Sequence, residues 1–332
     1  MSFRTEIEIV NTDFKIGHHS QILTIGSCFS EVMGNRLIEN KQRVLSNPFG
    51  TVFNPLSISR LLKFSLDLET INHDFITENQ GVWLHYDFHS SVWGKSKTEL
   101  LMNCEKKILE VRKWLQKTDV LMLTFGTAYA YFLNNHDLRL VSNCHKKPLS
   151  HFTKALLDVP RIIDDFEILY DSLIELNPEL HIILTVSPVR HTRDTLEGNH
   201  ISKSVLRLAT HYLVEHFKNV NYFPALEIML DDLRDYRFYK SDLIHPNEQA
   251  EAYIYEKFAI TYFDKELNSL LKLWQPLRFA LNHRPHYEGT VGHRLFLQDL
   301  LKKLIKLDPQ INLQAEILEV KNKLNLIDQH NS

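Results

Sequence analysis

The sequence predicts an α/β fold in which a parallel sheet lies between two layers of helices. From residue 20 to about residue 262, short apolar runs alternate with longer stretches of helical apolar spacing. Such alternation is typical of parallel strands joined by crossover helices. Residues 119–125 are apolar almost throughout, as expected of a strand buried on both faces. Two of the 10 glycines, Gly26 and Gly126, directly follow predicted strands.

Each predicted element is bounded by residues that favour turns or helix ends. The predicted strands are residues 21–25, 119–125, 181–186 and 220–223. The predicted helices are residues 31–40, 57–68, 98–116, 161–175, 202–216 and 248–263. Asn177-Pro178, for example, ends the helix before the third strand, and Ser187-Pro188 ends that strand. Together these elements predict one α/β domain, residues 1–263.

The C-terminal part of the chain, residues 264–332, has a different pattern. It contains two amphipathic stretches, residues 290–307 and 311–324, and no convincing strand. We therefore expect a helical C-terminal extension. Such an extension either packs on the main domain or mediates association with a partner or a second copy of the chain.

The composition excludes several classes of protein. A net charge of −3 predicts no general attraction to nucleic acid or to an anionic membrane. The longest apolar runs are too short to span a bilayer, and the first residues lack the apolar segment of a secretory signal. Three cysteines cannot all pair, which argues against a disulfide framework. We therefore expect a cytoplasmic enzyme or binding protein.

A first candidate for chemistry is the segment from Gly26 to Ser30, at the junction of a strand and a helix. Polar residues at the carboxyl ends of parallel strands are where open α/β sheets build their sites. A thiol at Cys28 would receive the field of the helix N-terminus, which lowers its pKa and favours the thiolate. Alternatively, Ser27 or Ser30 only caps the helix and Cys28 is a small buried residue.

A second candidate is the pair Asp242 and His245, directly before the last predicted helix of the domain. An aspartate can orient an imidazole through one ring nitrogen and leave the other nitrogen free as a base. The following Pro246-Asn247 is a turn and helix-start signal, which predicts that His245 lies in a loop. Many pairs with this spacing are structural, however.

Two glycine turns are candidates for stabilising an oxyanion. Asn47 to Thr51 and Thr124 to Ala128 each place a glycine after a short strand. The backbone N–H groups near Gly50 and Gly126 could then face a developing negative charge. Ordinary turns have the same appearance, so neither segment is specific alone.

In order along the chain, these four segments resemble the four blocks of the SGNH (GDSL-type) hydrolases. More specifically, the chain resembles the GSCFA-domain family, whose motif is present as Gly26-Ser27-Cys28-Phe29-Ser30. The further stretches that resemble the family are NPFGTVFNP (47–55), FHSSVWG (88–94), LTFGTAY (123–129), NCHKKP (143–148), TVSPVRH (185–191) and DDLRDYRFYKSDLIHPN (231–247). The resemblance implies a three-layer α/β/α sandwich with a parallel sheet, flavodoxin-like in type, that carries out acyl chemistry.

Two positions depart from the pattern of the SGNH superfamily. In its first block a serine follows an aspartate, whereas Cys28 follows Ser27 here. Its third block carries an asparagine that donates to the oxyanion, whereas Gly126 is followed here by Thr127 and Ala128. Thr127 is the candidate substitute for the missing donor.

Other residues are assigned to the pocket by the resemblance, which implies that His85, His89, Arg190 and His191 line it. Cys144 beside His145 is open to several interpretations: a redox partner of Cys28, half of a metal site, a positioned thiol, or a loop cysteine without chemistry. Arg237 could bind a substrate anion or pair with Asp232 or Asp235. The spacing of these residues does not indicate a metal site.

The leading hypothesis is a hydrolase or acyltransferase that acts on an acyl ester or thioester. Cys28 attacks, with Ser27 as the alternative nucleophile, His245 transfers the proton and Asp242 orients His245. The expected substrate is a small molecule or glycan that carries an acyl group, and no cofactor is required. The alternatives are a non-catalytic protein that binds a sugar or acyl ligand, and a thiol redox or metal-site protein that uses Cys28 and Cys144.

Overall fold

The structure is a computed structural model that describes residues 5–10, 12–134 and 138–330. Its centre is a five-stranded sheet in the order β11-β10-β6-β1-β2, and all neighbouring strands are parallel. The strands are β1 (Gln21–Gly26), β2 (Arg43–Ser46), β6 (Val120–Phe125), β10 (His181–Val186) and β11 (Val220–Tyr222). Numbered by sequence within this sheet, the order is 2-1-3-4-5, the flavodoxin-like doubly wound order. The predicted fold class is therefore confirmed.

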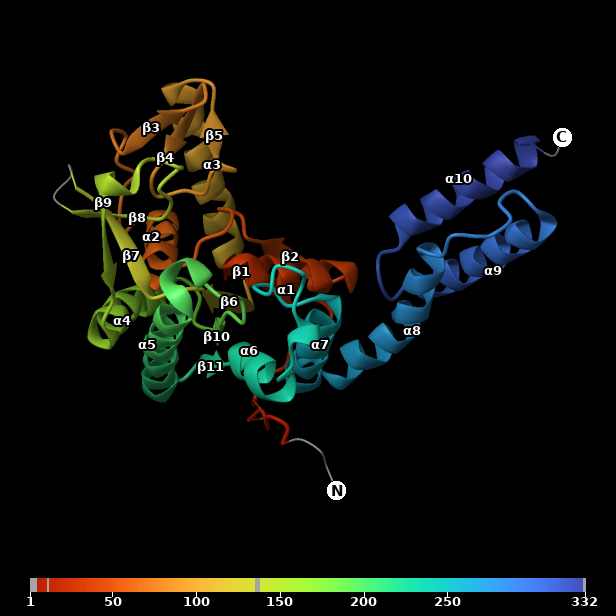
Figure 1. Ribbon diagram of the computed structural model, residues 1–332. Coiled ribbons are helices and arrows are strands. Elements are labelled where there is room, and N and C mark those ends of the chain that lie inside the picture. The colour runs from red at the N-terminus through yellow and green to blue at the C-terminus, as the bar shows by residue number, and fades with distance from the viewer. Residues whose placement is uncertain (1–4, 11, 135–137, 331–332) are drawn as a thin grey trace.

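Helices cover both faces of this sheet (Figure 1). One face carries α2 (Pro55–Ser65), α3 (Lys97–Leu115), α4 (Val159–Leu176) and α5 (Thr195–His216). The other face carries α1 (Cys28–Glu39), the short α6 (Ala225–Glu227) and α7 (Glu248–Tyr262). These layers make the three-layer sandwich that the sequence predicts.

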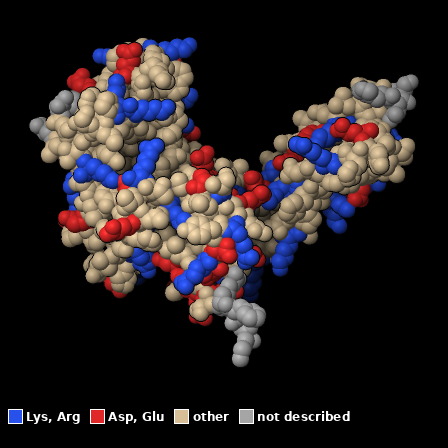
Figure 2. All heavy atoms as spheres, viewed as in Figure 1, with Lys and Arg blue, Asp and Glu red and all other residues tan. Residues whose placement is uncertain are grey.

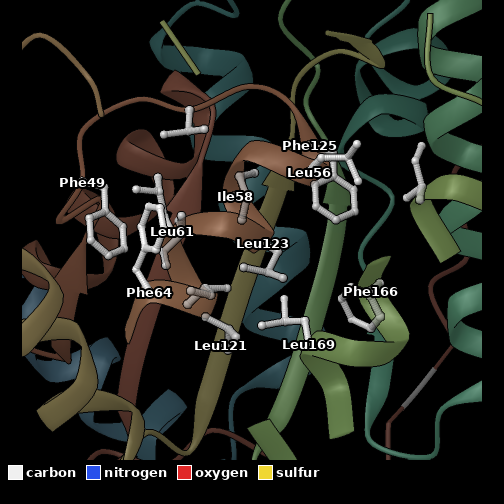
Figure 3. Close-up of a cluster of buried hydrophobic side chains, with 14 of the residues drawn as sticks. Phe49, Leu56, Ile58, Leu61, Phe64, Leu121, Leu123, Phe125, Phe166 and Leu169 are labelled. Atoms are coloured by element: carbon white, nitrogen blue, oxygen red, sulfur yellow. The ribbon is translucent and has the colours of Figure 1, made fainter. Parts of the chain in front are cut away.

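Alternation along β6 explains why both faces are apolar. Leu121, Leu123 and Phe125 belong to the cluster under α2 and α4, whereas Val120 and Met122 belong to the cluster under α1 and α7. Successive side chains of a strand point to opposite faces, so a strand with a helix layer on each side must be apolar throughout. Figure 3 shows Leu121, Leu123 and Phe125 between the side chains of α2 and α4.

Two helices begin three or more residues earlier than the sequence predicts. α1 begins at Cys28 and α5 at Thr195, where residues 31 and 202 are predicted. Apolar periodicity marks only the turns that pack on the sheet, and the first turn of a helix is often polar. For α1 the difference matters, because it places Cys28 inside the first turn of the helix.

Two small antiparallel sheets are absent from the sequence prediction. One contains β3 (Ile76–Asn79), β4 (Val82–His85) and β5 (Trp93–Gly94), and the other contains β7 (Tyr129–Leu133), β8 (Arg139–Val141) and β9 (Phe152–Leu156). They lie next to each other at the upper left of the view in Figure 1. They share a third hydrophobic cluster that includes Phe75, Tyr86 and Phe152. These strands are short and mixed in polarity, so their sequences give little signal.

The C-terminal extension is helical, as predicted, and it projects from the body of the molecule (Figure 1). It contains α8 (Lys265–Leu281), α9 (Val291–Leu307) and α10 (Gln314–His330), of which α8 is missed by the sequence analysis. Trp274 anchors α8 on α1, since it is 2% exposed and its indole N–H donates to the Glu39 carbonyl over 2.9 Å. Arg278 also pairs with the Glu39 carboxylate.

The surface carries charges of both signs. Figure 2 shows basic and acidic side chains interspersed over one face of the body and along the extension. Within the described ranges, none of the helices has the length and apolar character that a bilayer crossing requires.

Candidate active site

The turn between β1 and α1 is fixed by its neighbours. Gly26 has a φ of +148°, and a Cβ at this position would lie 2.2 Å from the carbonyl oxygen of Thr124 in β6. The Ser27 N–H donates to that same carbonyl, and the Gly26 N–H donates to Asn47 Oδ1 over 2.9 Å. Glycine is therefore required for the close approach of β1 to β6. Residue 28 follows at the point where the strand order reverses, which is where doubly wound sheets bind ligands.

Cys28, and not Ser27, is accessible at this turn. Ser27 is fully buried, and its hydroxyl has no hydrogen-bond partner among the described residues. Cys28 is partly exposed at the first position of α1. The geometry therefore favours the thiol as the attacking group.

The ionisation of Cys28 differs from the sequence expectation. Burial raises the pKa of the thiol, because a thiolate loses hydration inside the protein. Backbone N–H groups at the start of α1 and the charge of Lys203 lower the pKa, but they do not outweigh burial. The expectation of a lowered pKa for the Cys28 thiol is therefore wrong, because burial has the larger effect.

Asp242 and His245 form the pair that the sequence predicts. Asp242 Oδ2 accepts a hydrogen bond from His245 Nδ1 over 2.7 Å, and Oδ1 accepts from the backbone N–H of His245 and of Ile244. These three donors, the backbone N–H of His245 foremost, hold the pKa of the Asp242 carboxyl well below its usual range. With Nδ1 bound to the carboxylate, Nε2 of His245 remains for proton transfer.

Arg190 attaches this loop to the central sheet. Arg190 follows β10, and its backbone N–H donates to the Ile244 carbonyl over 3.2 Å. Its guanidinium lies 4.0 Å from the centre of the Tyr239 ring and donates to the Leu243 carbonyl. Arg190 therefore holds the loop that bears His245 at the carboxyl edge of the sheet, the edge at which Cys28 also lies.

His191 lies beyond the carboxyl end of β10, with its ring 5.2 Å from that of Phe53. Its Nε2 would lie 3.2 Å from a Cβ placed on Gly126, and it has no hydrogen-bond partner among the described residues. Burial lowers the pKa of His191 to about 4, and the positive charges of Lys203 and His245 also act on it. Lys203 interacts in turn with Cys28. His191 is therefore within electrostatic range of both Lys203 and His245.

Lys203 is a site residue that the sequence analysis missed. It projects from α5, is 4% exposed, and its Nζ donates to the carbonyls of Gly126 and Ser187 over 2.7 Å each. Burial lowers its pKa to about 7. A lysine in an amphipathic helix usually faces solvent. The signal that could have identified it is its spacing in the helix. Lys203 lies four residues after Asn199 and three before Leu206, which places all three on the same buried face.

The glycine turns do not offer the N–H groups that the sequence predicts. The N–H groups of Gly126 and Thr127 both donate to the Phe53 carbonyl, and that of Gly50 donates to the Asn47 carbonyl. The Thr127 hydroxyl bonds to Ser202 and to the Tyr129 N–H. The backbone N–H groups of Gly50, Gly126 and Thr127 are therefore already paired inside the fold, and a role of these turns in stabilising an oxyanion stays a prediction.

Asn47 and His89 cover the nucleophile turn. Asn47, with a φ of +42°, directs its side chain to the Gly26 N–H. His89 packs on Gly50, where a Cβ would lie 2.6 Å from its Nδ1. Burial lowers the pKa of His89, whereas the charge of Glu31 in the first turn of α1 raises it. Both residues therefore lie close to the start of α1.

Cys144 and His145 lie in the region of the small sheets. His145 Nε2 bonds to the His85 carbonyl over 2.9 Å, and His85 Nε2 bonds to the Asn72 carbonyl over 3.0 Å. Cys144 packs against the third hydrophobic cluster, and burial raises its pKa to about 11. Cys28 packs against a different cluster, that of α1 and α7.

The described residues contain no group of three or more His, Cys, Asp or Glu side chains that could hold a metal ion. Arg237 is exposed, with its guanidinium 4.8 Å from the centre of the Phe238 ring. Among the ion pairs of the described residues, Arg237 pairs with neither Asp232 nor Asp235; only its backbone N–H contacts Asp235.

Comparison with known proteins identifies the family that the chain matches. Residues 21–258 match the model of the GSCFA family, and residues 274–326 match that of the GSCFA domain protein, C-terminal domain. No curated protein matches the chain.

Solved structures similar to this one include two carbohydrate esterases, both with low TM-scores. The first is a carbohydrate esterase family 3 from Talaromyces cellulolyticus, with 10% identity, a TM-score of 0.35, and coverage of 77% of this chain and 98% of that chain. The second is a Clostridium thermocellum family 3 carbohydrate esterase, with 10% identity, a TM-score of 0.36 and the same coverage, 77% and 98%. Both likenesses are weak, so the fold assignment rests on the strand order.

Proposed function

The chain belongs to the GSCFA family, and from that premise we propose that it is a hydrolase or acyltransferase in which Cys28 attacks an acyl ester or thioester. His245 is the general base and acid, and Asp242 orients it. The observation that carries this proposal is the Asp242–His245 pair, with its 2.7 Å bond, at the same sheet edge as a partly exposed Cys28.

The proposed reaction has two halves. In the first, the Cys28 thiol gives its proton to His245 Nε2, the sulfur bonds to the carbonyl carbon, and the leaving group departs with that proton. In the second, His245 takes a proton from water or from an acceptor hydroxyl, whose oxygen bonds to the thioester carbon. The C–S bond then breaks, and His245 returns the proton to the Cys28 sulfur. Asp242 stays ionised throughout and stabilises the imidazolium.

The oxyanion needs donors other than those of Gly50 and Gly126. The Cys28 N–H is the proposed donor, because it belongs to the residue that attacks and lies in the first turn of α1, where backbone N–H groups have no acceptor within the helix. The N-terminus of α1 adds a favourable field for negative charge. A single strong donor would make turnover slow compared with that of an enzyme with a complete oxyanion hole.

An acyl group on a small molecule or glycan is the proposed substrate. A cavity of about 670 Å³ lies beside the loop after β10. Its lining includes Arg190 and the apolar side chains of Leu208 and Leu230, but not Cys28, Asp242 or His245. Such a volume and lining suit the apolar part of a ligand. The cytoplasm is the proposed location, since Cys28 must remain a free thiol.

Activity-based labelling tests this proposal. The purified protein is treated with a fluorophosphonate probe and, separately, with an iodoacetamide probe, and the labelled residue is identified by mass spectrometry. We expect iodoacetamide to label Cys28 faster than the buried Cys104, and H245A to slow that labelling. Fluorophosphonate labelling of Ser27 would show that the protein is a serine esterase instead.

A non-catalytic binding protein is the second candidate function. The observation that favours it is the occupation of the Gly50, Gly126 and Thr127 N–H groups, which leaves few oxyanion donors. Equilibrium binding of an acylated sugar that is recovered unchanged, with equal affinity in C28A, would support this alternative. Hydrolysis of the ester by the wild type and not by C28A would exclude it.

A further inference from the structure

We propose that the cavity beside the loop after β10 binds a small amphiphilic anion, with its carboxylate or phosphate group on Arg190 and its hydrocarbon chain along α5. The inference deepens the proposed function by naming the class of acyl ligand, and in that respect it rests on the proposed function. Binding of the anion in the cavity does not.

The cavity lies beyond the carboxyl ends of β10 and β11. Its lining comes from the loop after β10, from α5, and from α6 with the residues that follow it up to Tyr239. The lining residues of α5 recur every three or four positions, which places them on one side of the helix: Leu196, Asn199, Lys203, Arg207 and His211. Doubly wound sheets bind ligands outside the carboxyl ends of their strands, and a volume of about 670 Å³ is typical of a small-molecule site.

Accessible apolar side chains converge on this cavity. Leu196, Leu208, Leu230 and Tyr236 all line it and are all exposed, although they come from three separate segments of the chain. A single exposed leucine is ordinary on a protein surface, whereas a group that surrounds one hollow is typical of a ligand site. A hydrocarbon chain bound there would be removed from water together with these side chains.

The charged side chains of the lining are mainly cationic. Among the described residues that line the cavity, Glu227 supplies the one carboxylate, and it already accepts a hydrogen bond from Arg207 over 2.8 Å. The other two cations of the lining are Arg190 and Lys203. Because the whole chain has a net charge of −3, this excess of positive charge is local. It favours an anionic ligand.

A second cavity has the opposite charge. It measures about 450 Å³ and lies between α2 and the start of α4. Its described lining contains four carboxylates and two guanidinium groups, which belong to Glu69, Asp158, Asp164, Asp165, Arg60 and Arg161. A cationic lining is therefore not a general property of the hollows of this protein.

Arg190 is the group that can bind the anionic part of the ligand. Its guanidinium lies 4.0 Å from the centre of the Tyr239 ring and 5.2 Å from that of Tyr236, and both rings line the cavity. One of its N–H groups donates to the Leu243 carbonyl, and it takes part in none of the ion pairs of the described residues. A guanidinium has five N–H donors and can bind two oxygens of one carboxylate or phosphate. Lys203, in contrast, donates to two carbonyls inside the fold.

Arg190 also connects the cavity to the proposed reaction. Its backbone N–H donates to the carbonyl of Ile244, the residue before His245, over 3.2 Å. A ligand whose anionic group is bound by Arg190 therefore lies beside the loop that carries His245. The acyl substrate of the proposed function would accordingly carry a negative charge and a hydrocarbon chain.

Fluorescence titration tests the proposal. The probe is 11-(dansylamino)undecanoic acid, whose emission rises in an apolar environment, and its primary amide is the uncharged control. We expect the wild type to bind the acid about tenfold more tightly than the amide, because the amide cannot form the charge-assisted hydrogen bonds. R190Q should largely abolish this difference, whereas R237Q, which removes an exposed arginine outside the cavity, should preserve it. Equal binding of acid and amide by the wild type would overturn the proposal.

Displacement of the bound probe identifies the anionic group. Decanoate and decyl phosphate should each displace the acid, and the one that does so at the lower concentration carries the preferred group. Decyltrimethylammonium, which has the same chain and a positive charge, should be at least tenfold weaker. Displacement by the cation as readily as by the two anions would contradict the proposal.

A second pair of variants decides the case if R190Q does not fold. L208E places a carboxylate in the lining, and I201E places one on the same helix outside it; the two positions are 46% and 45% exposed. L208E should weaken binding of the acid about tenfold or more, because like charges repel and apolar contact is lost, and I201E should not. Equal affinities in both variants and the wild type would overturn the proposal.

The same proteins separate this proposal from the proposed function. Selective binding of the acid without turnover of p-nitrophenyl acetate would leave the anion site standing and end the proposed function. Turnover of that ester without preference for the acid over the amide would have the reverse meaning.

Discussion

Asp242 contacts His245 twice, through a 2.7 Å bond from Oδ2 to the ring Nδ1 and a 3.0 Å bond from Oδ1 to the backbone N–H. The two bonds fix both the position of the residue and the direction of its ring. A Leu243 φ of +56° and the bond from the Lys240 N–H to the His245 carbonyl close the loop around this pair.

Replacing Asp242 with asparagine should therefore remove activity more than stability. Nδ1 would lose its anionic partner, the ring could adopt the wrong tautomer, and the imidazolium would lose its stabilising charge. We expect kcat on p-nitrophenyl acetate to fall about 100-fold or more. The control is D231N, which changes an exposed aspartate paired with Arg234. Equal kcat values for D242N and the wild type would contradict the assigned role of Asp242.

Replacing Asn47 with alanine should loosen the nucleophile turn. The buried Gly26 N–H would lose its acceptor, which costs about 1–3 kcal/mol. The loss is measured as the free energy of unfolding in urea, alongside the alkylation rate of Cys28. N47D, which keeps an oxygen at the same place, should recover part of both values. If N47A is as stable as the wild type, Asn47 does not brace the turn.

The buried histidines predict that stability falls in mild acid. Burial lowers the pKa values of His85, His145 and His191 to about 4, so these rings stay neutral in the folded state. Below the unfolded pKa near 6.5 the unfolded chain binds more protons, and stability therefore declines as pH falls from about 6.5 to 4. Urea unfolding at pH 7 and pH 5 measures this slope.

A variant separates this slope from other acid effects. H85Q removes one buried titrating ring and should flatten the decline, and H211Q, which removes an exposed ring paired with Glu215, is the control. A steeper decline in H85Q would mean that the ring is charged in the folded protein.

Trp274 should hold the helical extension on the body without affecting the site. W274A removes a buried indole at the α8–α1 contact, and we expect a loss of about 3–5 kcal/mol in the free energy of unfolding. The exposed Leu273 provides the control L273A. The alkylation rate of Cys28 should not change in either variant. A large change in W274A would show that the extension influences the site.

The central sheet could be predicted because its strands are buried on both faces. The runs at β1, β6 and β10 are nearly continuous in apolar residues, and each ends at a glycine or a Ser-Pro pair. The small sheets could not be predicted, because β5 and β8 have two and three residues. α8 was missed, although its buried Leu267, Leu270 and Trp274 follow helical spacing.

In the site, contacts between residues close in sequence could be predicted, whereas contacts between residues far apart in sequence could not. The Asp242–His245 bond spans three residues and follows from their spacing. Lys203 reaches Gly126 across 77 positions, and the bond from the Gly126 N–H to the Phe53 carbonyl spans a similar distance in sequence. Such contacts depend on how the elements pack. For the same reason the sequence did not reveal that burial raises the pKa of the Cys28 thiol, since it contains no information on how deeply the thiol is buried.

The measurement that tests the central claim most directly compares ester turnover in four folded proteins: wild type, C28A, C28S and S27A. Circular dichroism confirms that each variant is folded before the assay. We predict that C28A has no turnover above background, that C28S loses most of it, and that S27A keeps a measurable part, because the Ser27 hydroxyl is buried away from solvent. Full activity in C28A together with none in S27A would contradict the account and identify Ser27 as the nucleophile.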